Sequence, residues 1–222
     1  MTMINRLFAI GDIHGCFDSL KELVENKIQL QKDDKLILLG DYIDRGDKSK
    51  EVVDFIIELS ENGYDVIPLL GNHEAMLLDA FEDEKNISKW FQNGGYETLR
   101  SFGINSVKEF GINYIDFFRQ LKLYDEYENH LFVHAGFNDE IYNPFADNYH
   151  MIWKCREKYT HPKLIDKIIL HGHCAIPYTI SEDRIRTGNP VVNIDTGCVY
   201  GVHTGYGRLT ALELYSRDIY FV

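Results

Sequence analysis

Three short phrases that carry aspartate, histidine and glycine each follow a brief apolar run in the first third of the chain. They are residues 11–15 (GDIHG), 40–46 (GDYIDRG) and 71–74 (GNHE), and residues 133–136 (VHAG) and 171–173 (HGH) repeat the design later. Because the carboxyl ends of neighbouring parallel strands meet at one edge of a sheet, these phrases would aim oxygen and imidazole ligands at one place. The pattern therefore predicts a metal site at a sheet edge.

The apolar runs before these phrases are short and aliphatic, and polar residues or glycine bound them, which is typical of strands covered on both faces. We expect strands over residues 7–10, 35–39, 66–70, 131–133, 168–170 and 191–194, and a terminal hairpin over 209–214 and 219–222. Amphipathic helical stretches lie between them, at about 18–26 and from a Ser49 cap to Gly63. Alternating strands and helices predict an α/β layered fold.

Residues 75–125 interrupt this alternation. Three helical stretches, 75–84, 87–102 and 114–121, follow one another without a strand between them, and they are rich in aromatic residues such as Trp90. We predict a single domain of residues 1–222 with residues 75–125 as a small inserted helical cap. Core packing is the expected role of its aromatic side chains, because large rings dominate protein cores.

Charge and hydropathy exclude two classes of partner. The formal net charge of -12 argues against a nucleic-acid partner, because binding a phosphate backbone needs a basic face. No run approaches the roughly 18 apolar residues of a membrane span, and the run at 7–10 is too short for a signal-peptide core. We therefore expect a cytoplasmic protein without nucleic-acid or membrane partners, and the oligomeric state stays open. The 4 cysteines lack CxxC spacing and are expected to be reduced thiols.

The ligand types suit the hydrolysis of a phosphate ester at two metal ions, which lie about 3.5–4 Å apart in such sites. Asp41 is the natural carboxylate to bridge both ions, because it lies between the other two early phrases in the chain. Asp12 and His14 are two residues apart and can reach one ion. The neutral donors suited to the second ion are Asn72, His134 and His173. Mixed oxygen and imidazole ligands favour Mn, with Fe or Zn as alternatives, over Ca or Mg.

The remaining phrase residues suggest other roles. His73 directly follows a predicted ligand and is placed to protonate the leaving oxygen as a general acid. Asp44 is expected to accept a hydrogen bond from His73, which would fix its tautomer and raise its pKa. Arg45 offers a planar fork for a phosphoryl group. For Glu74 we favour a helix-capping role, because a carboxylate suits the amino end of a helix.

Together, GDIHG, GDYIDRG and GNHE resemble the signature of the calcineurin-like metallophosphoesterases. More narrowly, they resemble the phosphoprotein phosphatase branch, which includes bacterial and phage serine/threonine phosphatases and symmetrical dinucleoside tetraphosphate hydrolases. The resemblance spans nearly the whole chain, because the later His-Ala-Gly and Gly-His phrases follow in order. It implies a two-sheet β-sandwich flanked by helices, which strand counting alone does not predict.

The resemblance also assigns the site. It implies one metal on Asp12, His14 and Asp41, and a second metal on Asp41, Asn72, His134 and His173. It implies an acid pair of His73 and Asp44, with Arg45 on the phosphate. A second phosphate-binding arginine is expected at Arg156, because residues 152–156 (IWKCR) resemble the segment that supplies it in bacterial members.

Two departures from the family pattern stand out. The family usually continues Gly-His with Thr-Pro, whereas residues 174–177 read CAIP, which leaves the ligand in place and affects only the local turn. Residues 195–201 (DTGCVYG) match a frequent ending, but residues 202–206 then intervene before the last strands. That longer loop either lines the site or decorates a hairpin.

The resemblance implies an enzyme, a phosphoprotein phosphatase that acts on phosphoserine, phosphothreonine or phosphotyrosine. A hydroxide that bridges the two divalent ions would attack phosphorus directly, without a covalent enzyme intermediate. The alternative is symmetrical cleavage of diadenosine tetraphosphate, a small phosphorylated substrate, at the same metals. A non-catalytic scaffold of the same fold is disfavoured, because every expected ligand and the acid histidine are present.

Overall fold

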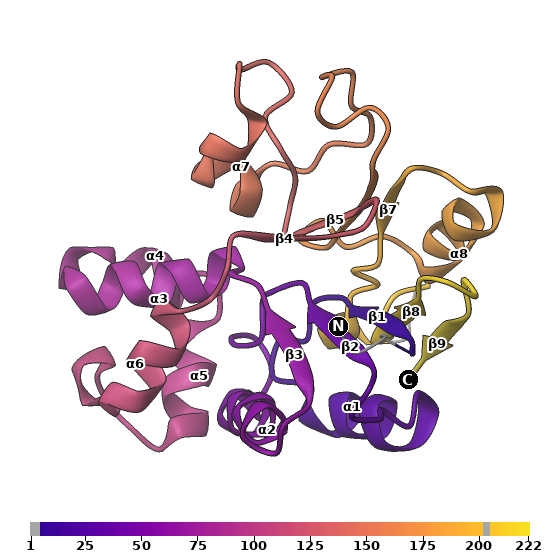
Figure 1. Ribbon diagram of the computed structural model, residues 1–222. Coiled ribbons are helices and arrows are strands. Elements are labelled where there is room, and N and C mark those ends of the chain that lie inside the picture. The colour runs from indigo at the N-terminus through magenta and orange to yellow at the C-terminus, as the bar shows by residue number, and fades with distance from the viewer. Residues whose placement is uncertain (1–4, 202–204) are drawn as a thin grey trace.

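Nine strands in the described part of the chain form two mixed sheets with helices around them (Figure 1). The structure is a computed structural model that describes residues 5–201 and 205–222. The first sheet has the order β3-β2-β1-β8-β9 and consists of β1 (Leu7–Ile10), β2 (Lys35–Leu38), β3 (Asp65–Pro68), β8 (Thr210–Glu213) and β9 (Ile219–Phe221). The second has the order β4-β5-β6-β7 and consists of β4 (Tyr124–Tyr127), β5 (His130–Val133), β6 (Ile168–His171) and β7 (Val191–Asn193).

Each sheet contains three parallel strands. In the first sheet β1, β2 and β3 are parallel, and β8 pairs with β1 in the antiparallel direction. In the second sheet β5, β6 and β7 are parallel, and β4 is antiparallel to β5. The carboxyl ends of parallel strands lie at the same edge of their sheet. The six parallel strands therefore end at two edges, one in each sheet, and these edges adjoin. The five polar phrases follow β1, β2, β3, β5 and β6.

Alternation along the strands builds the layers. In β1, Leu7 and Ala9 belong to a buried cluster that includes Phe132 of the second sheet. Phe8 and Ile10, which point the other way, belong to the cluster formed with the surrounding helices. Both faces of β1 are therefore covered, which explains its uninterrupted apolar sequence. The predicted two-sheet sandwich flanked by helices is confirmed.

Helices fill the connections. They are α1 (Phe17–Lys21), continued by a π-helical turn (Glu22–Lys27), α2 (Ser49–Glu61), α3 (Asn72–Glu82), α4 (Ile87–Phe91), α5 (Gly95–Phe102), α6 (Ile112–Arg119), α7 (Asn148–Trp153) and α8 (Tyr178–Thr187). The stretch 87–102, predicted as one helix, is two, because Gly94 adopts a left-handed φ of 101°. Ser49 is the first residue of α2 and not its cap, and its hydroxyl accepts the backbone N–H of Asp44.

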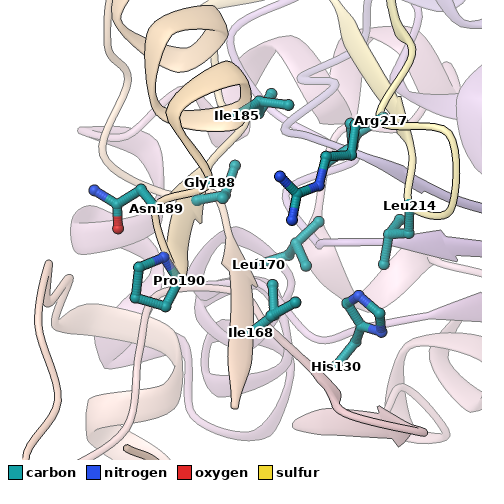
Figure 2. Close-up of a pocket in the computed structure, with 11 residues that line it drawn as sticks. His130, Ile168, Leu170, Ile185, Gly188, Asn189, Pro190, Leu214 and Arg217 are labelled. Atoms are coloured by element: carbon teal, nitrogen blue, oxygen red, sulfur yellow. The ribbon is translucent and has the colours of Figure 1, made fainter. Parts of the chain in front are cut away.

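One further feature, a cavity, lies away from the polar phrases. A cavity of about 120 Å³ opens between the sheets, with aliphatic walls and the guanidinium of Arg217 reaching into it (Figure 2). Its lining includes Ile168 at the start of β6 and Pro190 just before β7, so it lies at the end of the strands opposite to the phrases.

Among the described helices, none has the length and apolar character needed to cross a membrane.

Candidate metal centre

Asp41 lies at the centre of the predicted ligands. It follows β2, it is almost fully buried, and its two carboxylate oxygens face different imidazoles. Its Oδ1 lies 3.4 Å from Nε2 of His134, whereas its Oδ2 lies 3.5 Å from Nε2 of His14 and 3.8 Å from Nε2 of His73. The structure thus forms two groups with metal-ligand spacing that share one carboxylate, namely His14, Asp41 and His73, and Asp41, His134 and His173.

The second group also includes the side-chain oxygen of Asn72. Asn72 Oδ1 lies 3.0 Å from His134 Nε2 and 2.8 Å from His173 Nδ1, and the two ring nitrogens are 3.2 Å apart. Ligand atoms bound to one ion at about 2.1 Å lie about 3.0–3.4 Å apart in octahedral or tetrahedral geometry. These three atoms, with Asp41 Oδ1, therefore fit a single divalent cation.

The buried histidines present the correct nitrogen. His14 Nδ1 donates to the Ile43 carbonyl at 2.9 Å, and His134 Nδ1 donates to the Leu39 carbonyl at 2.8 Å. A proton on Nδ1 leaves the lone pair on Nε2, which is the atom that faces Asp41 in both cases. Fixing the tautomer through the far nitrogen is how proteins orient metal-ligating histidines.

Burial sets the protonation states that a cation requires. It lowers the pKa of His14 to about 3 and the pKa of His173 to about 4, and it lowers the pKa of His134 as well. For Asp41, burial alone would raise the pKa, but the neighbouring imidazoles, His134 first, outweigh it and lower the pKa. At neutral pH the centre therefore offers neutral imidazoles and an ionised carboxylate.

Asp12 lies beside these groups and belongs to neither. Both of its carboxylate oxygens accept the backbone N–H of His173 at 3.1 Å. A Cβ on Gly172 would come within 2.0 Å of Asp12 Oδ1, so only glycine allows this approach. Burial, with the charges of Asp195 and Asp41, raises the pKa of Asp12. In this arrangement Asp12 holds the loop that carries His173.

His73 and Arg45 form a polar network on the side of the first group. His73 Nδ1 donates to Asp44 Oδ2 at 2.6 Å. Burial lowers the pKa of His73, but Asp41 and Asp44 outweigh it and raise the pKa above its ordinary value. The Arg45 guanidinium donates to Nε2 of His14 at 2.7 Å and to the Tyr200 hydroxyl at 3.0 Å, and it lies 3.0 Å from Nε2 of His73.

Strained backbone accompanies the centre. Among residues other than glycine, His14, Asp41, Asp44, Arg45 and His173 all have φ between 47° and 72°, in the left-handed region. Such conformations cost about 1–3 kcal/mol each and persist only where the surroundings fix them. Their concentration in the phrases marks a functional site by an argument independent of the side-chain distances.

Glu74 does more than the predicted capping. Its carboxylate accepts the Gly71 N–H at 3.1 Å, which caps α3, and it also accepts the backbone N–H groups of Asp41 at 3.0 Å, Tyr42 at 2.8 Å and Ile43 at 3.3 Å. Burial, with the charge of Asp41, raises the pKa of Glu74 to about 8. One side chain thus holds the loop after β2 against the start of α3. The contacts with residues 41–43 are long-range, so the sequence holds no local signal for this role.

Arg156 forms ion pairs with Glu140 at 3.1 Å and Asp139 at 3.9 Å, and in the described part of the chain no contact joins it to the metal-ligand groups.

Tyr200 was not among the predicted site residues, yet its hydroxyl contacts Arg45. Tyr200 belongs to the DTGCVYG segment of residues 195–201, which is the sequence signal for it. The inserted loop after it falls partly outside the described residues, which resume at Gly205.

The expectation of four reduced thiols is wrong for one pair. Cys155 and Cys174 form a disulfide, whereas Cys16 and Cys198 are free. Because Cys155 precedes Arg156 and Cys174 follows His173, the disulfide joins the segment of the predicted phosphate-binding arginine to the loop of a predicted ligand. The two cysteines are 19 residues apart in the sequence, so no local spacing motif announces the pairing.

Comparison with known proteins identifies the family. Residues 6–205 match the family described as Calcineurin-like phosphoesterase. The chain belongs to this family. As a metallophosphoesterase it is a hydrolase of a metal-dependent family, and the two groups around Asp41 supply candidate ligands for the metals.

Two relatives of this metallophosphoesterase have different named activities. It is 43% identical over 82 residues, 37% of this chain, to a symmetrical bis(5'-nucleosyl)-tetraphosphatase of Buchnera aphidicola subsp. Baizongia pistaciae. It is 37% identical over 94 residues, 42% of this chain, to serine/threonine-protein phosphatase 2 of Salmonella typhimurium. The matches span only 28% and 40% of those two relatives.

Solved structures confirm the fold. A crystal structure provisionally assigned as a diadenosine tetraphosphatase has a TM-score of 0.68 and 20% identity, and the match covers 99% of this chain and 93% of that one. A cold-active protein tyrosine phosphatase has a TM-score of 0.65 and 18% identity, over 98% of this chain and 78% of that one. At such identities the likeness concerns the fold alone.

Proposed function

We propose that this metallophosphoesterase hydrolyses phosphate monoesters with two divalent cations, as a serine/threonine or tyrosine phosphoprotein phosphatase. The observation that carries the proposal is Asp41, whose two oxygens face separate imidazole groups 3.4 Å and 3.5 Å away. Mixed carboxylate, amide and imidazole ligands favour Mn, with Fe or Zn as alternatives. We infer one cation at His14 and Asp41, with Asp12, which lies beside the two groups, as a further ligand. We infer the other cation at Asp41, Asn72, His134 and His173.

Bound cations there would supply positive charge to the phosphoryl oxygens and activate water. The chain's own residues do the rest. Arg45, at the edge of the first group, would hold a phosphoryl oxygen with its planar fork and neutralise charge that builds up in the transition state. Arg156 is proposed as a second arginine for the phosphate, which requires it to leave Glu140.

His73 is proposed as the general acid. Its Nδ1 is fixed on Asp44, and its Nε2 points toward the Arg45 guanidinium, where the phosphoryl group would bind. The raised pKa of His73 supports the same role, because an acid must hold its proton at working pH. From that position His73 would give its proton to the leaving oxygen of the ester.

The alternative substrate is diadenosine tetraphosphate, cleaved symmetrically at the same centre. It is supported by relatives named symmetrical bis(5'-nucleosyl)-tetraphosphatase. Two aromatic rings flank the centre, since Tyr200 contacts Arg45 and the Trp153 ring lies 6.2 Å from the His173 ring. Both would suit a stacked base. A scaffold without catalysis is a weaker third candidate, since the ligand groups and the acid pair are assembled.

One assay separates these functions. Protein loaded with Mn is given a panel of phosphopeptides and, in parallel, diadenosine tetraphosphate, and the products are resolved. Release of inorganic phosphate from the peptides, with the dinucleotide intact, is the expected result. Two ADP from the dinucleotide with untouched peptides would replace the proposal by its alternative. No product from either substrate would favour the third candidate, a scaffold without catalysis.

We further infer that the chain is one domain, with residues 75–125 as an insert. The supporting observation is a shared core, since Trp90, Leu99 and Phe118 of the insert belong to the same buried cluster as Phe8 and Ile10 of β1. A cytoplasmic location and a phosphoprotein partner stay predictions.

A further inference from the structure

Asp44 connects the centre to the helices of the 75–125 insert. This carboxylate is fully buried, and His73 Nδ1 donates to its Oδ2 at 2.6 Å. Two donors from the insert reach the same group. Trp90 Nε1 of α4 donates to Oδ2 at 2.9 Å, and the Thr98 hydroxyl of α5 donates to Oδ1 at 2.6 Å. Both Asp44 oxygens are therefore held by side chains that lie 46 and 54 residues away in the sequence.

Thr98 binds Asp44 in two ways. Its hydroxyl oxygen accepts the Asp44 backbone N–H at 2.9 Å while the hydroxyl proton goes to the carboxylate. The left-handed φ of 72° at Asp44 places the N–H and the side chain on the same hydroxyl. A buried carboxylate that lacks donors carries a large desolvation penalty. Any position of Asp44 that breaks one of these hydrogen bonds is therefore disfavoured.

Trp90 is itself fixed in place. Its side chain is fully buried, and a Cβ on Gly95 would lie 2.4 Å from the indole ring, so glycine at this position allows the close packing. The turn between α4 and α5 also touches the loop after β2, where the Arg45 N–H donates to the Gly94 carbonyl at 3.3 Å. The insert thus contacts the side chain of Asp44 and the backbone of Arg45 at once.

We propose that Trp90 and Thr98 are positioning residues, which hold Asp44 so that it aims His73 at the leaving oxygen. The inference rests on the proposed function and deepens it, because it gives the insert a part in proton donation besides core packing. It also explains why an indole N–H and a hydroxyl are buried at a helix interface that apolar residues would otherwise fill.

The consequence is selective. An ester with a poor leaving group needs the proton of His73, whereas one with a good leaving group departs without it. Loosening Asp44 should therefore slow phenyl phosphate hydrolysis and spare 2,4-dinitrophenyl phosphate. A general loss of packing or of metal would slow both esters together.

The experiment compares four variants of the Mn-loaded protein on these two esters. Thr98→Val removes the hydroxyl, which is both a donor and an acceptor for Asp44, and keeps the side-chain shape. Trp90→Phe removes the indole N–H and leaves a smaller ring. Thr98→Ser restores the hydroxyl, and Leu99→Ala loosens the same helix without touching the network. For Thr98→Val and Trp90→Phe we expect kcat on phenyl phosphate to fall about 10–100-fold, the usual cost of removing a supporting hydrogen bond, with KM unchanged. Thr98→Ser should keep the wild-type ratio between the two esters, and Leu99→Ala should keep it despite a lower melting temperature.

A second readout is independent of turnover. In zinc-loaded protein the downfield Nδ1–H proton resonance of His73, assigned by its loss in His73→Asn, should move in Thr98→Val and Trp90→Phe and stay in Leu99→Ala. An unmoved resonance in both variants, or an equal loss on both esters, would overturn the inference. A resonance that moves in a protein without phosphatase activity would support the positioning and reject the proposed function alone.

Discussion

The two groups that share Asp41 are held in different ways. In the first, charged side chains surround the imidazoles, because Arg45 binds both His14 and His73 and Asp44 binds His73. In the second, His134 is fixed by a backbone carbonyl, and its ring nitrogen lies directly against Asn72 and His173. The first group is therefore equipped to handle the charge and proton of a substrate besides a cation, whereas the second is equipped to hold a cation alone.

The largest expected effect comes from removing what the groups share. Asp41→Asn should reduce turnover by about 10⁴-fold or more, because metal binding contributes several kcal/mol and each 1.36 kcal/mol is tenfold. Elemental analysis should show fewer than two metals per chain. Full metal content with normal turnover would show that Asp41 is not the shared ligand.

A pair of histidine variants sharpens the comparison. His73→Asn should keep both metals and lower turnover by about 10²–10⁴-fold, the usual range of general acid catalysis. His134→Asn should instead lose metal affinity, and added Mn should restore part of its activity. If His73→Asn lost a metal as well, His73 would be a ligand of the first group and not its acid.

The disulfide beside the second group should matter for stability more than for turnover. Replacing Cys155 and Cys174 by serine should lower the free energy of unfolding by about 3 kcal/mol, from the loop-closure entropy of a chain segment of this length. Denaturant unfolding measures the change, with Cys16→Ser as the control for a free cysteine. A stability equal to that of the wild type would mean that the pair does not restrain the unfolded chain.

The smallest effect concerns pH, and it depends on His171, a buried histidine two residues before His173. Burial lowers its pKa to about 4, below the ordinary value of 6.5. The unfolded chain then holds a proton that the folded chain lacks, so stability is lost as pH falls from 6.5 toward 4. Replacing His171 by asparagine removes this dependence. The difference in unfolding free energy between wild type and variant should shift by about 1.4 kcal/mol between pH 7.5 and 5.5. A shift of zero would mean that His171 keeps its ordinary pKa in the folded protein.

Local chemistry explains what the sequence predicted. The strands before the phrases are apolar on both faces, and ligands such as Asp41 and His134 follow them directly, so the strands and the meeting of the ligands could be predicted. The division into two sheets was implied only by the family resemblance. β4, α7 and α8 were not predicted, because they are short or largely polar and lack a periodic apolar pattern. The long-range partners of Asp44 and Glu74, and the disulfide, depend on three-dimensional contacts that no spacing encodes.

The position of β1 has a consequence for how the protein is made. β1 lies between β2 and β8, and the N–H of Gly11, at the start of the first phrase, donates to the Thr210 carbonyl. During synthesis β2 is available soon after β1, but the other edge of β1 stays open until residues 210–213 leave the ribosome. The loop that carries Asp12 and His14 therefore gains this hydrogen-bond partner only after residues 210–213 have emerged, so a nascent chain would acquire the proposed metals late.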